Sequence, residues 1–485
     1  MSDLSLRLSP DARDVYPVLN EIKPSVDRTL EDRSIDNKYR ESATNATNCH
    51  FSDGNVNNNN KTNNNNARCV RLNAKSLKNP LSIYRAYLDC RKHKRSTANA
   101  IVFERDFSSN LYNLTKEIQN GTWAPTRSLC FVVRNPKPRE VFAADFRDRI
   151  VHHLLTRFLE PYWERVFIYD SFACRKDKGT LAAVKRLHHF MLSATENGKK
   201  RAYFLQLDVK NFFMSINKDI LWSLVKRGLM KQKGVCGDDF KTALWLAKTI
   251  IYNDPTLNHI NKSSAREWAA VPKEKSLFYA PKNKGIPIGN LTSQFFANVY
   301  LNELDQYVKH VLKVKYYIRY VDDFIIIDRD KNKLIALYSV IKRFLKEKLD
   351  LTLKSSVKLA GLSCGINFLG YIQHIFYRLQ RRRVSGNLKS KLYTYNNKRL
   401  RLDDLFKIRA FLNSYLAHCK EALSFRLLEK ILSKNNWLFK YFSIYKYVAS
   451  IDRKFLTRKK ISILCDTYRN LWRGTWKNSQ MTASL

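Results

Sequence analysis

The sequence YYIRYVDDFIII, residues 316–327, places two adjacent aspartates between two short apolar runs. Runs of β-branched and aromatic residues on either side of a short polar segment are typical of a tight β-hairpin. We therefore expect strands over Tyr316–Tyr320 and Phe324–Asp328, with Val321-Asp322-Asp323 between them. Both carboxylates then stand at the end of a sheet that is otherwise apolar.

A third acid ends another apolar run, since Tyr203–Asp208 reads Tyr-Phe-Leu-Gln-Leu-Asp. If this strand lies beside the hairpin, Asp208 meets Asp322. Neighbouring buried carboxylates cost free energy unless a cation neutralises them. Carboxylate oxygens are hard ligands that suit Mg²⁺, and carboxylates from adjoining strands can hold two such ions. The pattern therefore indicates a metal-dependent site at this end of the sheet.

Other paired residues lack this context. Asp238-Asp239 and Asp403-Asp404 interrupt no apolar run, so we expect both in solvated turns. His152-His153 and His188-His189 lie in helical patterns without carboxylates at ligand spacing. We expect these histidines to pack or to contact a bound nucleic acid, and we do not expect them to bind a metal.

The remaining periodicity outlines the chain. Residues 1–66 are polar, and nine of the twelve residues from Asn55 to Asn66 are asparagine, which predicts a flexible linker behind a short helix within Val15–Arg40. After about residue 375 the chain reads as helical and strongly basic, with aromatics that pack or stack on bases (Trp437, Tyr441 and Tyr445). Apolar spacing predicts helices over Leu81–Lys92, Phe107–Ile118, Phe146–Val166 and Ser293–Leu312, and a strand within Trp123–Val133.

The charge balance bears on the partner. The chain holds 87 Lys and Arg against 43 Asp and Glu, which leaves a formal charge of +44. A folded protein with such a surplus needs a polyanionic partner, because its surface would otherwise repel itself. Nucleic acid is the first candidate and an anionic membrane surface the second. The 44% share of hydrophobic residues supplies a large core and excludes wholesale disorder.

Location follows from what the sequence lacks. It has no apolar stretch of about 18 residues, so we expect no spanning helix. Its start lacks the basic and apolar regions of a secretory signal. The nine cysteines are scattered without a Cys-x-x-Cys pair, which indicates reduced thiols. We expect a cytoplasmic protein.

Six segments in order resemble one family, the reverse transcriptases. Four of the segments resemble the palm of these enzymes: LDVKNFFMSI (207–216), GIPIGNLTSQFFANVYLNELDQYV (285–308), YYIRYVDDFIII (316–327) and GINFLGY (365–371). The other two resemble the fingers of prokaryotic, retron- and intron-type members: NPKPREVFAADFRDRIVHHLL (135–155) and DSFACRKDKGT (170–180). The resemblance runs from about residue 75 to about 435. It implies an α+β right-hand polymerase fold with fingers, palm and an α-helical thumb. The implied division is an extension (1–66), fingers and palm (67–375), and a basic thumb with a C-terminal extension (376–485).

The resemblance also implies roles for the acids. Asp208 and Asp322 correspond to the two obligate metal ligands, and Asp323 corresponds to the nearby third acid. Two Mg²⁺ ions, with Mn²⁺ as the alternative, would activate a primer 3′-hydroxyl and hold the triphosphate of a deoxynucleotide.

Further positions take roles by the same resemblance. Phe213 corresponds to an aromatic that excludes a ribose 2′-hydroxyl, with core packing as the alternative. Lys137 and Arg139 correspond to basic residues that hold the triphosphate, with plain surface charge as the alternative. The nucleotide-supporting loop corresponds to Gly289 through Gln294. Tyr371 corresponds to the primer grip, again with core packing as the alternative. A hybrid duplex would contact the basic run that includes Arg381, Arg382, Arg383, Lys389 and Lys391.

One departure narrows the family. Most members have Gln-Gly before the supporting loop and Ser-Pro at its end, whereas this chain has Ile288-Gly289 and Ser293-Gln294. The form IGNLTSQ is typical of diversity-generating retroelement enzymes and of several defence-associated, or unknown-group, reverse transcriptases. The segment FLNSYLAHCKEALSFRLL (411–428) resembles the thumb of that subset.

These resemblances imply an RNA-directed DNA polymerase that copies a dedicated, structured non-coding RNA in bacterial anti-phage defence. Its partners would be that RNA, an RNA–DNA hybrid product and deoxynucleoside triphosphates, with a homo-oligomer as an option and no membrane. A diversity-generating retroelement enzyme, template-independent or protein-primed synthesis, and an RNA-binding scaffold are the alternatives. We find no Cys/His cluster typical of an endonuclease module and no second acidic group typical of an RNase H.

Overall fold

The computed structural model describes residues 76–92, 94, 97–134, 137–232, 237–445 and 447–451. The chain divides into two units, Met1–Ser76 and Leu77–Leu485, and nearly all described residues belong to the second. The helix predicted within Val15–Arg40 and the Asn-rich tract lie outside the described residues.

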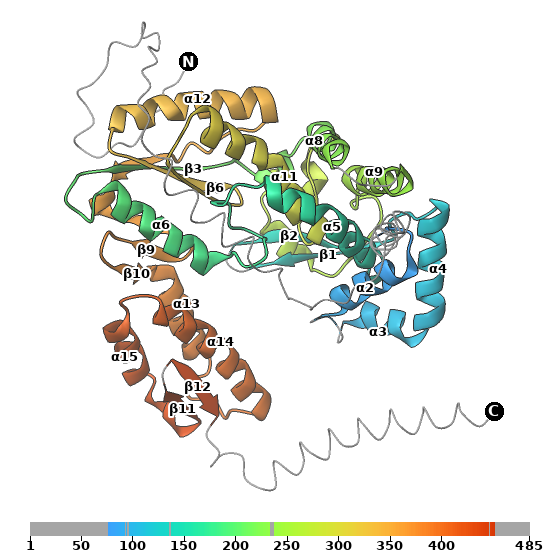
Figure 1. Cartoon of the computed structure of the whole chain (residues 1–485). Coiled ribbons are helices and arrows are strands. Elements are labelled where there is room, and N and C mark those ends of the chain that lie inside the picture. Colours follow the sequence, from blue (N-terminus) through green and yellow to red (C-terminus); the bar gives the residue numbers. More distant parts are fainter. Residues whose placement is uncertain are drawn as a thin grey trace, which may run out of the picture. The chain divides into compact units, whose positions relative to one another are not determined.

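Helices and strands are mixed along the described chain, which confirms the α+β class (Figure 1). The helices are α2 (Pro80–Arg91), α3 (Ala98–Arg105), α4 (Phe107–Asn120), α5 (Phe146–Val166), α6 (Thr180–Ala194), α7 (Phe212–Ser215), α8 (Lys218–Lys231), α9 (Gly237–Tyr252), α10 (Ala265–Ala269), α11 (Leu291–Gln306), α12 (Lys331–Leu349), α13 (Arg382–Tyr393), α14 (Leu402–Lys420) and α15 (Phe425–Ser433). The strands are β1 (Ser128–Val133), β2 (Arg139–Ala143), β3 (Tyr203–Asp208), β4 (His259–Asn261), β5 (Tyr316–Tyr320), β6 (Asp323–Asp328), β7 (Lys358–Gly361), β8 (Ile366–Phe368), β9 (Tyr371–Gln373), β10 (Arg378–Gln380), β11 (Phe442–Tyr445) and β12 (Val448–Ile451).

The central sheet has the strand order β5-β6-β3-β7, and each neighbouring pair is antiparallel. The predicted hairpin is confirmed, although Asp323 already belongs to β6. Side chains alternate between the two faces, as a strand requires. Leu207 and Phe324 lie opposite each other and enter the core that α5, α11 and α12 share. Phe204 and Ile327 pair on the other face and pack with α6.

α11 is buried on nearly every side and packs against α5, α8 and α12. It begins two residues before the predicted start and continues beyond Gln306 as a π-helix over Tyr307–Val311. Its buried face includes the polar side chains Asn298 and Asp305. Buried polar groups are costly without hydrogen bonds, so these side chains need partners inside the protein.

A second sheet has the order β2-β1-β4, with β1 and β4 parallel. The strand predicted within Trp123–Val133 starts only at Ser128. The preceding residues bind α5 instead, because Trp123 Nε1 and the Thr126 backbone N–H both donate to the buried Asp148 carboxylate, at 3.2 and 2.7 Å. These donors therefore bind the Asp148 carboxylate and do not pair with a neighbouring β-strand.

The chain after residue 375 is less purely helical than predicted. Helices α13, α14 and α15 share one core, but β10 adds a strand to the sheet that β8 and β9 form just before this region, and β11 pairs with β12. Trp437 and Tyr441 are partly buried against this core, as their packing alternative predicted, while Tyr445 on β11 is 70% exposed.

The two other aspartate pairs contradict the prediction of solvated turns. Asp238 and Asp239 begin α9, and Asp403 and Asp404 begin α14. Acids in a first helical turn are stabilised by the helix dipole and by exposed backbone N–H groups. Asp239 accepts from the Leu77 N–H at 2.9 Å. No helix within the described ranges is long and apolar enough to cross a bilayer.

Candidate active site

Three acids adjoin at one end of the central sheet. The strand register sets Asp208 opposite Asp323, and the Val209 N–H donates to the Asp322 carbonyl at 3.3 Å. Gln206, two residues before Asp208 on the same face, donates to both carboxylate oxygens of Asp323 at 3.1 and 3.3 Å. The predicted meeting of Asp208 and Asp322 is therefore present in the backbone.

Lys354 is the residue that sequence reasoning missed here. Its backbone N–H donates to the Asp208 carbonyl at 2.8 Å, and its Nζ pairs with Asp208 Oδ2. The sequence feature that could have indicated this contact is the alternation of Leu351 and Leu353, because it is typical of a short extended segment, and Leu353 pairs with Val209. Among 87 basic residues, however, nothing in the sequence singled out this lysine.

Burial crowds negative charge at this point. The pKa of Asp322 is raised, first by burial and then by the Asp208 carboxylate. Burial also raises the pKa of Asp323 to about 7, against the hydrogen bonds from Gln206 and with a smaller contribution from Asp208. Without a cation to balance the charge, Asp323 therefore exchanges its proton near neutral pH, and Asp322 does so about one pH unit lower, at about 6.

The donor set fits a divalent cation. Within the described ranges, no three His, Cys, Asp or Glu side chains already surround a metal position. Asp208 Oδ1, however, is buried without a hydrogen-bond partner among the described residues. A hard cation such as Mg²⁺ would satisfy that oxygen and offset both causes of the raised pKa values, burial first and the repulsion between the acids second. Metal binding by Asp208, Asp322 and Asp323 remains a proposal.

The loop before α11 closes on the second sheet. Gly289 has φ of +127°, and a Cβ there would lie 2.8 Å from the Phe142 carbonyl oxygen. The Phe142 N–H donates to the Ile288 carbonyl at 2.8 Å, so the loop runs along β2. Gln294 is exposed in the first turn of α11. Glycine is therefore required for the close approach of loop and strand.

Phe213 lies beside this loop on α7. Its carbonyl accepts from the Ile286 N–H at 2.9 Å, and its half-buried ring packs on Phe212 with centroids 5.4 Å apart. Lys137, two residues before β2, and Arg139, the first residue of β2, are both exposed, and the loop contacts this strand. The roles of these residues toward a nucleotide remain predictions.

Tyr371 is placed in the core. Its side chain is 4% exposed, its ring stacks on His418 with centroids 3.9 Å apart, and its hydroxyl donates to the His418 carbonyl at 3.2 Å. These contacts favour the packing alternative, and a primer-grip role remains a prediction. The five basic residues proposed to contact nucleic acid are all exposed at or within α13: Arg381, Arg382, Arg383, Lys389 and Lys391.

The family described as "Reverse transcriptase (RNA-dependent DNA polymerase)" matches residues 134–373, a range that contains the central sheet and all three acids. The chain contains a reverse transcriptase domain. With that family match, the predicted right-hand polymerase fold is confirmed, while the division of the chain into fingers, palm and thumb remains a prediction. The match does not distinguish the diversity-generating and defence-associated subset that the IGNLTSQ segment predicted from other reverse transcriptases.

Curated relatives are more distant. Protein YkfC of Escherichia coli (strain K12) is 26% identical over 213 residues, covering 43% of this chain and 48% of that protein. The Putative COX1/OXI3 intron 2 protein of Saccharomyces cerevisiae is 22% identical over 256 residues, covering 52% of this chain and 26% of that protein. The chain therefore spans about half or less of the length of these relatives.

Solved structures show remote likenesses. Apo telomerase from Candida tropicalis matches with a TM-score of 0.41 at 12% identity, over 64% of this chain and 58% of that chain. Telomerase from Candida albicans in complex with a TWJ fragment of telomeric RNA matches with a TM-score of 0.37 at 11% identity, over 67% and 58%.

Proposed function

We propose that this chain is an RNA-directed DNA polymerase whose active site is Asp208, Asp322 and Asp323. The observation that carries the proposal is the register of Asp208 opposite Asp323, with Asp322 adjacent, inside a reverse transcriptase domain. Adjacent, half-buried carboxylates without a counter-cation cost stability, and a protein that had no use for them would gain nothing by keeping them. A nucleotidyl transferase has such a use.

The chemistry divides between the acids and their surroundings. Two Mg²⁺ ions held by the three acids would supply charge neutralisation and a more acidic primer 3′-hydroxyl. The protein would orient that hydroxyl in line with the α-phosphate of a deoxynucleotide, and positioning would supply much of the acceleration. Lys137 and Arg139 would hold the triphosphate through charge-assisted hydrogen bonds. The half-buried ring of Phe213 would exclude a 2′-hydroxyl.

The template would be a dedicated, structured non-coding RNA. The formal charge of +44 and the exposed basic residues of α13 support a stable complex with a polyanion beyond one short duplex. The IGNLTSQ loop and the long polar extension support a role in anti-phage defence. A cytoplasmic location, Mn²⁺ as the alternative ion and a homo-oligomeric state belong to the same proposal.

The test is primer extension on an RNA template with Mg²⁺ and four deoxynucleotides. Asp208→Asn and Asp322→Asn should each abolish synthesis and leave RNA binding in a gel-shift assay unchanged. Asp238→Asn is the matched control, because its side chain is 70% exposed and lies outside the site. Synthesis retained in either active-site variant would overturn the assignment.

Sequencing the nucleic acids that copurify with the protein separates the alternatives. A defined RNA with complementary DNA supports templated synthesis in defence. DNA that matches a repeat beside a variable gene indicates a diversity-generating retroelement. Non-complementary DNA, or DNA linked to the protein, indicates template-independent or protein-primed synthesis. RNA without DNA indicates a scaffold.

A further inference from the structure

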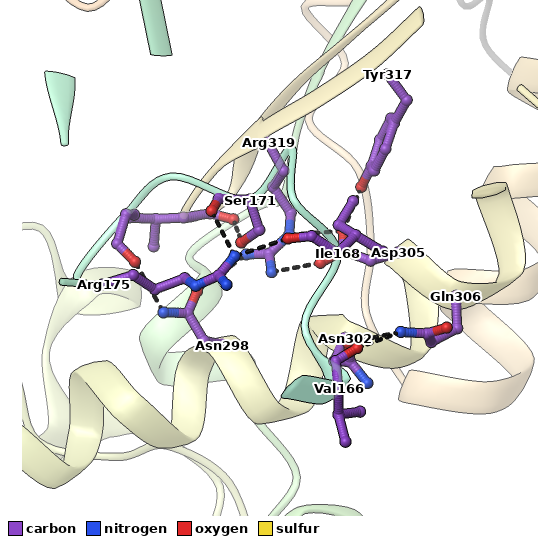
Figure 2. Close-up of polar contacts among 12 residues, drawn as sticks. Val166, Ile168, Ser171, Arg175, Asn298, Asn302, Asp305, Gln306, Tyr317 and Arg319 are labelled. Carbon is purple, nitrogen blue, oxygen red and sulfur yellow. Dashed lines mark hydrogen bonds and ion pairs between the residues drawn. The ribbon is translucent and has the colours of Figure 1, made fainter. Parts of the chain in front are cut away.

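A fully buried ion pair lies behind the active-site turn. Arg319 on β5 and Asp305 on α11 are both 0% exposed. The arginine donates from Nε to Asp305 Oδ1 at 2.8 Å and from Nη2 to Oδ2 at 2.6 Å, which is a two-point fork (Figure 2). The Tyr317 hydroxyl also donates to Oδ1 at 2.7 Å. The carboxylate therefore fixes the plane of the guanidinium.

The remaining nitrogen of the guanidinium points at the turn. Arg319 Nη1 donates to the Val321 carbonyl at 3.0 Å and to Asn298 Oδ1 at 3.3 Å. The same side chain thus bonds α11 on one edge and the residue before Asp322 on the other. A lysine has one compact ammonium and cannot make both sets of bonds in this fixed geometry.

The turn that this bond holds is strained. Val321 has φ of +56°, a left-handed conformation that is a genuine outlier for a β-branched residue. Such a residue persists only where its surroundings over-determine it. Besides the strand pairing on either side, Arg319 holds the Val321 carbonyl and the Val209 N–H holds the Asp322 carbonyl. Removing the first takes away the side-chain bond on the Val321 carbonyl, so that only backbone pairing holds the turn: the Val209 N–H on the Asp322 carbonyl and the ladder pairs of Asp323 with Tyr320 and Asp208.

The backbone of Arg319 joins a third segment to the same point. Its N–H donates to the Asp170 carbonyl at 2.9 Å, and its carbonyl accepts from the Phe172 N–H at 3.0 Å. Asn298 donates to the Ala173 carbonyl at 2.8 Å. Figure 2 shows Arg175 beside this group, where it donates to the Ile168 and Ser171 carbonyls at 2.7 and 2.8 Å.

We propose that Arg319 is a positioning residue of the polymerase: oriented by Asp305, its guanidinium holds the Val321 carbonyl and so sets the turn that presents Asp322. This inference rests on the proposed function. The competing account is that the ion pair only stabilises the core. Core stability does not require charge, because apolar residues of similar volume often replace a buried ion pair without loss. Holding the Val321 carbonyl does require a donor.

The test is the paired replacement Arg319→Met with Asp305→Leu, assayed for thermal unfolding and for primer-extension kinetics. We expect folding to be retained, kcat to fall on the order of 10²-fold, as for a catalytic group displaced by about 1 Å, and the KM for deoxynucleotide to change little. The control pair Arg227→Gln with Glu303→Gln removes another ion pair of α11, between side chains 52% and 30% exposed. It should leave kcat unchanged.

A folded Arg319→Met, Asp305→Leu protein with wild-type kcat would overturn the inference and leave the polymerase assignment standing. An inactive wild-type protein would overturn the assignment itself. If the double variant does not fold, Arg319→Lys decides. That variant keeps a charge beside Asp305, and we expect it to fold and to show the same loss of kcat. A folded Arg319→Lys protein with wild-type kcat would equally overturn the inference.

Discussion

Gly289→Ala should damage both stability and nucleotide binding. Its φ of +127° is one that side chains rarely adopt, and the strain of such a conformation is about 1–3 kcal/mol. The added methyl would also lie 2.8 Å from both the Phe142 carbonyl oxygen and Val141 Cγ1. Overpacking of this kind costs about 1–3 kcal/mol, so the free energy of unfolding should fall by about 2–6 kcal/mol.

Two glycines separate these contributions. Gly121 has φ of +72°, and a methyl group added there would meet nothing within 4 Å, so Gly121→Ala should show the strain alone. Gly386 lies within α13 in open space at an ordinary φ, so Gly386→Ala should be neutral or should stabilise by about 0.4–1 kcal/mol.

Urea unfolding of the three variants ranks their free energies of unfolding, and primer-extension kinetics give the KM of each for deoxynucleotide. We expect Gly289→Ala to be the least stable and to raise this KM, because the loop would move away from β2. Gly289→Ala as stable as Gly121→Ala, with an unchanged KM, would refute the reasoning from close contact.

The remaining predictions concern stability, pH and nucleic-acid binding. Asp305→Ala leaves Arg319 buried without its partner and should lower the free energy of unfolding by about 3–5 kcal/mol in urea; a loss below about 1 kcal/mol would mean that water or another acid replaces it. Burial lowers the pKa of His152 to about 3, so the unfolded chain binds the extra proton as pH falls below about 6.5. The neutral, buried His152 therefore makes its full contribution to stability above that pH and loses it as the pH falls. Between pH 7 and pH 5 the free energy of unfolding of the wild type should fall by about 2 kcal/mol more than that of His152→Asn, measured by urea unfolding at both pH values. Arg382→Gln with Arg383→Gln should reduce the salt dependence of RNA binding by about two ion equivalents in filter binding, whereas an unchanged slope would place the RNA elsewhere.

Local pattern was enough to predict the elements that build the site. The hairpin from Tyr316 to Asp328 and the helix Phe146–Val166 were predictable because apolar periodicity and burial agree there. The apolar spacing predicted one continuous helix in spite of Pro161, and α5 does continue through that proline. The pairing of β3 with β6 followed because β3 ends on Asp208 and the hairpin presents Asp322 and Asp323 just before the apolar residues of β6, so that a common site would need the two strands side by side.

Contacts between distant segments could not be predicted in the same way. Lys354 reaches Asp208 across 146 positions, and no local pattern distinguishes it from other lysines. Tyr371 is buried by His418, 47 residues later, so its packing depends on a helix whose position the sequence does not encode locally. The same applies to Arg319, whose flanking apolar run predicts a strand but gives no partner for the charge.

The buried fork between Arg319 and Asp305 has a consequence for recombination between related chains. A β5–β6 hairpin moved alone into another scaffold would bring an arginine without its carboxylate and a strained valine without its restraint. The smallest exchangeable block is therefore discontinuous: the hairpin, α11 and the backbone around Asp170–Ala173 must travel together. Chimeras with crossover points inside that block should fail more often than chimeras with crossovers outside it.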